Sequence, residues 1–348
     1  MFCTSERRKK VKQSAFKTLE YDKILEKLAL YTESEAVKER ILSLEPYETL
    51  FDAEIHEKTG PEAMLCLHGD AQEIKRRLCS LEDGCALGRL LDIDVIAPDG
   101  RKLSRTEIGL PPRKCLLCEN DAPVCARSRA HSADELFARA GEIIDAHFED
   151  AFIRRTAENA QRALLCEVAV TPKPGLVDRH NSGAHDDMDV FTFIHSACTL
   201  CGYFEACTRI GLAHRGGDAQ ACFDALRVPG LLAEADMRRA TAGVNTHKGA
   251  IFSLGIACAS LGMSWGESFS AEHILLRCGE MTRLRMQDEL ENARQGQART
   301  FGEQVYQKKG VGGVRAEAAG GFAGVRETAL PRLNAALDAG LSLNDAAL

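Results

Sequence analysis

Apolar residues recur at helical spacing in the first part of the chain. One set runs through residues 19–30, and a second set runs through residues 37–42. Residues three and four apart share one face of a helix, so each set predicts an amphipathic helix. Ser34 is a suitable N-cap for the second helix, and Pro46 stops it. The pattern therefore predicts a helical N-terminal segment over residues 1–63.

The pattern changes between residues 64 and 140. Residues 90–95, LLDIDV, alternate apolar and polar side chains and are rich in branched ones, which predicts a β-strand. A Pro-Asp-Gly turn follows at 98–100, and then a loop rich in proline and cysteine. Helical periodicity returns after His131. We therefore expect a small α/β segment over residues 64–140.

Helical periodicity dominates residues 141–348, and prolines and glycine-containing turns interrupt it. Glycine is dense between Gly310 and Gly324, where we expect a loop over a ligand. The expected fold is a mostly α C-terminal helical domain, a small α/β segment in the middle and helices at the N-terminus.

Composition narrows the class of protein. The 348 residues suffice for two domains, and 45% hydrophobic with 27% charged residues is ordinary for a soluble globular protein. A net charge of −7 argues against a nucleic-acid binder, although a local basic pocket for a polyphosphate stays open. No apolar run reaches the ~20 residues of a membrane helix, and no secretory signal follows the basic start.

The cysteines indicate a reducing compartment. There are 14 of them, which could suggest a secreted disulfide scaffold, but the chain is too large for one. Several lie inside apolar helical runs, where a thiol packs as a small hydrophobic group, and Cys198 and Cys201 are expected in such a core. We expect a cytoplasmic protein that binds neither nucleic acid nor membrane.

Asp92 and Asp94 form the first candidate site. Residues two apart on a strand point to the same face, so the two carboxylates are expected side by side. Mg²⁺ would relieve their repulsion, because it prefers oxygen ligands and bridges to phosphates. The alternative is a solvated edge strand of alternating polarity, and spacing alone slightly favours that alternative.

A second candidate site has the pattern C-x₂-C-x₆-C-x₅-H, formed by Cys115, Cys118, Cys125 and His131. Three thiolates and one imidazole complete the tetrahedron that structural Zn²⁺ requires. The alternative is a set of packed or surface thiols in a loop, and the spacing leaves both interpretations open.

The motifs around these two sites resemble a known family. LGRLLDIDVIAPDGRKLSR, GLPPRKCLLC and CARSRAH are similar to the apo-citrate lyase phosphoribosyl-dephospho-CoA transferases, over most of residues 70–140. The resemblance implies attachment of a prosthetic group to a serine of the citrate lyase acyl-carrier subunit, with release of pyrophosphate. It also implies Mg²⁺ at the aspartate pair and phosphate contacts from Arg89, Arg105 and Arg113. The family's N-terminal portion has no visible counterpart before residue 64, and residues 15–62 instead resemble the opening helices of MutS-related ATPases with a nuclease domain.

Four blocks in the helical half resemble a second family. They are EVAVTPKPGLVD, NSGAHDDMD, RATAGVNTHKGAIFSLG and GVGGVRAEAAGGF. In order and separation they are similar to the triphosphoribosyl-dephospho-CoA synthases, from about residue 145 to 348. The resemblance implies that a ribose hydroxyl of 3'-dephospho-CoA attacks the anomeric carbon of the ribose of ATP. Adenine leaves, and the triphosphate stays on the transferred ribose.

This reaction needs a base, a donor for adenine and cations for the triphosphate. With the resemblance, the catalytic candidates are Asp178, His185 and His247, with His247 as acid or donor. Asp187 is a candidate Mg²⁺ ligand, and Asp178 is an alternative one. Candidates for substrate contacts are Lys173, Arg238, Arg239, Asn245, Thr246 and Lys248, together with Arg89 in the first half. Without the resemblance, the same residues would be assigned to turns, helix caps and surface pairs.

The leading hypothesis is a fusion of both enzymes that acts chiefly as the synthase on ATP and 3'-dephospho-CoA. A catalytically inactive, truncated fusion that binds nucleotide or a partner is the alternative. The resemblance places further helices and a polar Gly-Asp-Thr-Asn block after Leu348, which favours that alternative. In a third hypothesis, only the half with the aspartate pair is active.

Overall fold

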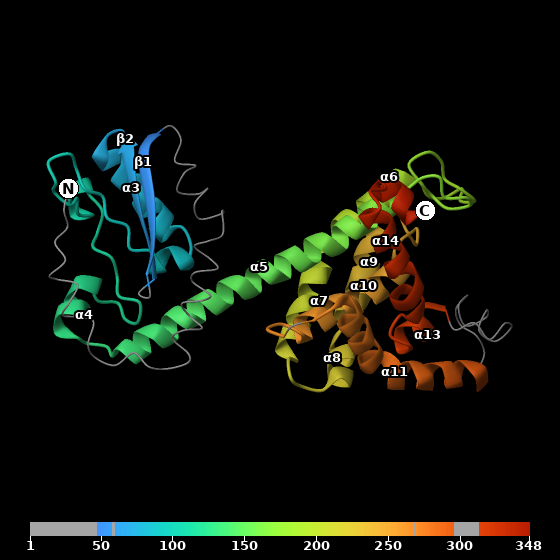
Figure 1. Ribbon diagram of the computed structural model, residues 1–348. Coiled ribbons are helices and arrows are strands. Elements are labelled where there is room, and N and C mark those ends of the chain that lie inside the picture. Colours follow the sequence, from blue (N-terminus) through green and yellow to red (C-terminus); the bar gives the residue numbers. More distant parts are fainter. Residues whose placement is uncertain (1–46, 58–59, 268, 296–312) are drawn as a thin grey trace. The chain divides into compact units, whose positions relative to one another are not determined.

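A computed structural model describes residues 47–57, 60–267, 269–295 and 313–348 (Figure 1). The chain divides into two compact units, Met1–Glu149 and Asp150–Leu348. The two helices predicted before Pro46 lie outside the described residues.

The first elements that the structure describes form a β-hairpin that the sequence patterns did not predict. Strands β1 (Glu48–Glu57) and β2 (Gly60–His68) pair antiparallel. Helix α3 (Ala71–Asp83) follows, and the carboxylate of its N-cap Asp70 accepts a hydrogen bond from the backbone N–H of Glu73 at 2.9 Å. These strands contradict the prediction of a helical segment over residues 1–63.

The predicted strand at residues 90–95 is wrong. A 3₁₀ helix, η2 (Leu87–Leu90), is followed by an extended segment that forms no ladder, only a bond from the Leu103 N–H to the Val95 carbonyl at 2.9 Å and an isolated bridge between Ile96 and Lys102. Side chains of α3 also bind its backbone: Glu82 Oε1 accepts from the N–H of Ile93 at 3.2 Å, and Lys75 Nζ donates to the Ile93 carbonyl at 2.9 Å. The alternation of the segment is nevertheless real, because Val95 is buried in a cluster with α3 while the two aspartates are exposed.

The rest of the first unit consists of short elements around a second small core. This core joins Leu87 of η2 to Ile143 and Ile144 of the long helix α5. The elements between them are the 3₁₀ helix η3 (Thr106–Ile108) and α4 (Ala122–Ser128), and α5 spans Ala133–Ala169.

The second unit is helical in its described residues, as predicted. The end of α5 belongs to it, because Ala157, Ala160 and Leu164 lie in its core. The other elements are α6 (Val190–Thr199), α7 (Cys201–Ala213), α8 (Ala219–Ala225), α9 (Arg227–Ala240), α10 (Lys248–Met263), α11 (Ala271–Gln295), α13 (Gly313–Ala319), the π-helical η4 (Val325–Ala329), α14 (Leu330–Asp338) and α15 (Leu343–Ala347).

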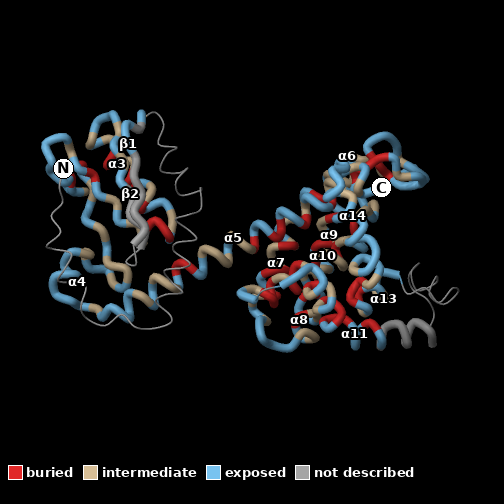
Figure 2. Tube along the Cα trace, viewed as in Figure 1, coloured by how far each residue is buried: buried red, intermediate tan, exposed pale blue. Residues whose placement is uncertain are grey.

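Helix α10 is the central helix of this unit, and Figure 2 shows buried residues gathered around it. It is apolar on all sides, as a helix buried by neighbours must be. Glycines let α7 approach it closely. A Cβ on Gly211 would lie 2.0 Å from the Ala259 carbonyl oxygen, and one on Gly262 would lie 2.3 Å from that of Thr208.

Two further findings concern the remaining expectations. The glycine-rich stretch expected as a loop is helical over Gly313–Ala319, while residues 310–312 lie outside the described part. Within the described residues, no helix combines the length and the apolar character that crossing a membrane requires.

Candidate functional site

The buried carboxylate of Asp178 organises the loop between α5 and α6. Its oxygens accept hydrogen bonds from Thr171 Oγ1 at 2.7 Å and from the backbone N–H groups of Lys173, His180 and Asn181 at 3.0, 2.8 and 3.0 Å. The hydrogen bond from the Thr171 hydroxyl has the largest effect on the pKa of Asp178. Together with the bonds from the N–H groups it holds this pKa far below its usual range. The charged carboxylate is therefore a weak base that fixes the shape of the loop.

Two contacts attach the start of this loop to the rest of the unit. Lys173 Nζ donates to the Glu167 carbonyl at 2.8 Å and to Glu167 Oε1 at 2.6 Å, at the end of α5. Asn344 of α15 accepts from the Thr171 N–H at 2.9 Å and donates to the Thr171 carbonyl at 2.8 Å. Residues from the early part and from the last helix of the second unit's sequence thus hold the loop.

His247 is the most deeply buried of the predicted site residues that carry an imidazole. It precedes α10 and is 4% exposed. Its Nδ1 lies 2.7 Å from Oγ of the fully buried Ser196 of α6, and Thr246 Oγ1 donates to the same Oγ at 2.8 Å. The ring of Phe193 meets the imidazole edge to face, with 5.0 Å between centroids.

The hydrogen bonds of this group determine where the imidazole proton lies. Because Thr246 donates to Ser196 Oγ, the single Ser196 hydroxyl proton is available to Nδ1 of His247. The neutral ring then carries its proton on Nε2, a buried atom without a hydrogen-bond partner in the described residues. Burial lowers the pKa of His247 to about 4, against a smaller opposite effect of the Glu167 charge. The imidazole is therefore neutral at pH 7.

The polar residues around the start of α10 lie at the surface. Asn245 Oδ1 accepts from the Lys248 N–H at 3.3 Å, and Lys248 Nζ forms an ion pair with Glu234 at 3.1 Å. In the last turn of α9, Arg238 donates to the Gly243 carbonyl at 3.2 Å, and Arg239 pairs with Asp236 at 2.8 Å. Three cationic side chains and one amide thus stand at exposed positions close in sequence to His247.

His185 and Asp187 form a separate exposed pair. Their Nδ1 and Oδ1 atoms are 3.9 Å apart. Within the described residues, neither has a hydrogen bond or ion pair to the group around His247.

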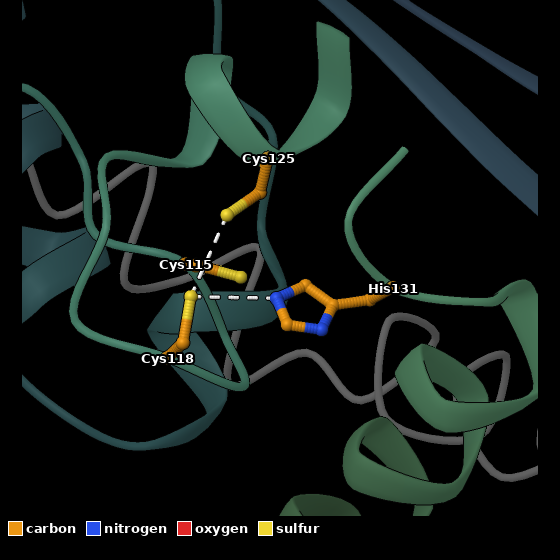
Figure 3. Close-up of side chains that lie close together, drawn as sticks. All are labelled: Cys115, Cys118, Cys125 and His131. Carbon is orange, nitrogen blue, oxygen red and sulfur yellow. Dashed lines mark hydrogen bonds between the residues drawn. The ribbon is translucent and has the colours of Figure 1, made fainter. Parts of the chain in front are cut away.

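In the first unit, the structure brings together the four residues of the C-x₂-C-x₆-C-x₅-H pattern, here named the Cys/His cluster (Figure 3). Its ligand atoms all lie within 4.8 Å of one another. The Leu117 N–H, donating to Sγ, lowers the pKa of Cys115 to about 7, whereas the contact with Cys118 raises the pKa of Cys125 to about 11.

The aspartate pair is exposed, and Asp94 forms an ion pair of 2.6 Å with Lys102. The nearby arginines bind protein groups. Arg89 donates to the carbonyls of Lys114 and Cys115 at 2.8 and 3.3 Å. Arg113 donates to the carbonyls of Leu91, Gly88 and Arg89, and Arg105 pairs with Glu82 and Asp83. These bonds occupy the guanidinium groups that we expected to contact phosphate.

Comparisons with known proteins decide the family. Over residues 153–348 the sequence matches the family described as ATP:dephospho-CoA triphosphoribosyl transferase. The chain belongs to this family. Over residues 8–147 it also matches the family described as apo-citrate lyase phosphoribosyl-dephospho-CoA transferase.

Relatives of the transferase and synthase types support the same assignment. The chain is 36% identical over 334 residues to the protein CitXG of Haemophilus influenzae, across 93% of this chain and 68% of that protein. It is 38% identical over 286 residues to CitXG of Leuconostoc mesenteroides, across 79% of this chain and 61% of that protein. A probable 2-(5''-triphosphoribosyl)-3'-dephosphocoenzyme-A synthase of Vibrio cholerae is 42% identical over 189 residues, across 54% and 60% of the two chains. The chain thus spans 60% to 68% of these relatives.

The family match corrects one expectation about the N-terminal region. We expected no counterpart of the attaching transferase before residue 64, but the match begins at residue 8. The comparisons do not support the resemblance of residues 15–62 to MutS-related ATPases.

Sequence reasoning missed three residues that the synthase half places beside the candidates. Ser196 contacts His247, Glu167 contacts Lys173, and Asn344 contacts Thr171. Glu167 opens one of the family blocks, which was a usable signal. Ser196 and Asn344 lie outside the blocks, and the sequence offered no signal for them.

Proposed function

We propose that this chain transfers the triphosphoribosyl group of ATP to 3'-dephospho-CoA with release of adenine. The observation that carries the proposal is the buried His247, whose Nε2 has no partner in the described residues although Ser196 fixes its other nitrogen. A buried polar atom without a partner costs free energy, and a ligand that accepts its proton in a hydrogen bond removes that cost.

The reaction forms one bond and breaks one. An oxygen–carbon bond forms between a ribose hydroxyl of 3'-dephospho-CoA and the anomeric carbon of ATP's ribose. The carbon–nitrogen bond to adenine breaks, and its electron pair leaves with adenine. The hydroxyl loses a proton, and adenine gains one. Positive charge develops on the ribose between these events, so nearby carboxylates and donors that face the leaving nitrogen stabilise the transition state.

We assign His247 the role of a hydrogen-bond donor. Its pKa of about 4 leaves too little imidazolium at neutral pH for it to act as the main acid. A neutral ring with the proton on Nε2 donates to a nitrogen of adenine or to an oxygen of the substrate. Thr246 and Ser196 act on substrate only through the imidazole, whose orientation they hold.

The triphosphate belongs, in this proposal, at the start of α10. The first turn of a helix offers free N–H groups and the positive end of the helix dipole. Lys248, Asn245, Arg238 and Arg239 stand on exposed positions there and at the end of α9. Lys248 exchanges Glu234 for a phosphate oxygen when ATP binds.

Lys173 and Asp178 have positioning roles in the same proposal. Asp178 keeps its charge and shapes the loop, and Lys173 joins that loop to Glu167. Asp187, with His185 beside it, offers an exposed carboxylate of the hard-oxygen type that Mg²⁺ prefers. A bound Mg²⁺ would neutralise part of the triphosphate charge.

A second activity is proposed for the first unit because its sequence matches the attaching transferase over residues 8–147. It attaches the finished prosthetic group to the acyl-carrier subunit of citrate lyase. Asp92 and Asp94 are exposed, so their oxygens suit Mg²⁺ on a pyrophosphate leaving group. Lys102 would release Asp94 on metal binding.

Adenine release tests the synthase proposal. The full chain is incubated with ATP and Mg²⁺, with and without 3'-dephospho-CoA, and adenine is measured by chromatography. We expect adenine only when 3'-dephospho-CoA is present, a loss of activity in Lys248→Ala, and unchanged activity in Arg209→Ala, an exposed cation that pairs with Asp150. ATP binding without adenine release would identify the inactive alternative.

A further inference from the structure

The Cys/His cluster lies where α4 meets the loops on either side of it in the sequence. Helix α4 is one short helix, and Cys125 is its only buried residue. Isolated helices of this length are unstable in water, and a segment without a core of its own needs another source of stability. The side chains of the cluster come from α4 and its flanking loops and point toward one another (Figure 3).

The separations inside the cluster fit one tetrahedral metal ion. Cys118 Sγ lies 3.5 Å from Cys125 Sγ and 3.3 Å from His131 Nε2. Zn–S and Zn–N bonds of the usual lengths require separations of about 3.8 Å between two sulfurs and about 3.5 Å between sulfur and nitrogen. Along these two separations the ligand atoms of Cys118, Cys125 and His131 would move by only a few tenths of an ångström to bind the ion, and all four ligand atoms already lie within 4.8 Å of one another.

The donor set and the local backbone select the kind of metal. Three thiolates and one imidazole are the soft donors that zinc prefers over magnesium or calcium. The Leu117 N–H points at Cys115 Sγ at 3.5 Å, and such donors offset the negative charge of a thiolate. Four protein ligands leave no open position for a substrate, so the ion has a structural role.

We infer that Cys115, Cys118, Cys125 and His131 bind one Zn²⁺ ion, which holds the loop at 113–121, α4 and the start of α5 together and fixes the segment that carries Asp92 and Asp94. The link to that segment is a set of arginine bonds. Arg113 donates to the backbone carbonyls of Leu91 and Arg89, and Arg89 donates in turn to the backbone carbonyl of Lys114. A fixed cluster therefore fixes residues 88–91, directly before the aspartates.

Metal analysis of the full chain tests the zinc site without reference to any activity. After purification and gel filtration, we expect one zinc per chain in the wild type and none in Cys118→Ser. Cys198→Ser is the matched control, because two residues also separate Cys198 from Cys201, but these cysteines lie in helices α6 and α7. It should retain one zinc. A wild type without zinc, or zinc retained in Cys118→Ser, would overturn the proposal.

A measurement on the wild type covers the case in which Cys118→Ser does not fold. Zinc is removed with a chelator and replaced by Co²⁺, which should give the visible bands of tetrahedral cobalt bound to thiolates. Bands of octahedral cobalt, or a mass two hydrogens lower from a Cys118–Cys125 disulfide, would contradict the zinc site.

Hydrogen exchange tests whether the zinc ion fixes the segment that carries Asp92 and Asp94. Chelation should speed exchange at the Leu91 and Ile93 amides, which bond to Gly88 and Glu82, and leave α10 unchanged. Unchanged exchange at Leu91 and Ile93 in the zinc-free protein would refute the link to the aspartates, whatever the outcome for the proposed transferase activity.

Discussion

The hydroxyl of Ser196 lies 2.7 Å from Nδ1 of His247, although the two residues are 51 positions apart in the chain. The contact joins α6 to the start of α10 in the core of the second unit. It leaves the other imidazole nitrogen, Nε2, as a buried donor without a partner in the described part of the chain. The proposed role of His247 depends on this pair.

Ser196→Ala should lower kcat more than it changes KM. The variant leaves Nδ1 unpartnered, which costs about 1–3 kcal/mol and frees the ring to turn or change tautomer. Loss of 1.4 kcal/mol in the transition state alone lowers kcat on the order of tenfold. Ser270→Ala, at an exposed serine before α11, is the control and should match the wild type. Equal kcat for both variants would remove Ser196 from the mechanism.

The stability of the second unit should rise with pH between about 4 and 6.5. His247 has a folded pKa of about 4, lower than its ordinary value, so the unfolded chain binds the proton more tightly. The stabilisation is complete above the unfolded pKa and is lost as the pH falls toward 4. Between pH 7 and 4 the wild type should lose about 3 kcal/mol more than His247→Gln. Denaturant unfolding at several pH values measures this, and parallel curves would contradict the burial of a neutral imidazole.

Asp178→Asn should lower both the melting temperature and adenine release. The amide has only one oxygen acceptor, whereas the carboxylate receives bonds from Thr171, Lys173, His180 and Asn181. Thermal unfolding followed by circular dichroism checks the prediction. The matched control is Asp186→Asn in the same loop, where the carboxylate is exposed. If Asp178→Asn melted with the wild type, the carboxylate would not organise the loop.

Two glycines of α7 should respond in opposite ways to alanine. Gly211→Ala pushes a Cβ against the Ala259 carbonyl and should destabilise the unit by about 1–3 kcal/mol. Gly202→Ala meets no atom within 4 Å and should leave stability unchanged or raise it by up to about 1 kcal/mol. Denaturant midpoints of the two variants give the comparison. A neutral Gly211→Ala would mean that α7 and α10 are farther apart than the structure has them.

The helical half was predictable because its apolar residues follow the helical period, which burial against α10 requires. The Cys/His cluster was also accessible from the sequence, since its four residues lie within one short stretch. The conformation of residues 90–95 was not predictable. Alternation reports which side chains are buried, and not whether a second strand supplies hydrogen bonds. Here the side chains of Glu82 and Lys75 bind the backbone of Ile93, and the N–H of Leu103 binds the Val95 carbonyl. Long-range pairs such as Ser196 with His247 depend on the packing of helices, which no local spacing encodes.

Adenine release by His247→Gln in the presence of ATP, Mg²⁺ and 3'-dephospho-CoA tests the central claim most directly. His273→Gln, at a half-buried histidine near Glu267, provides the control. We predict that His273→Gln releases adenine at the wild-type rate and that His247→Gln is slower by two orders of magnitude or more, on the order of what a positioned catalytic donor contributes. Wild-type release by a folded His247→Gln variant would contradict the assignment of the reaction to the group at the start of α10.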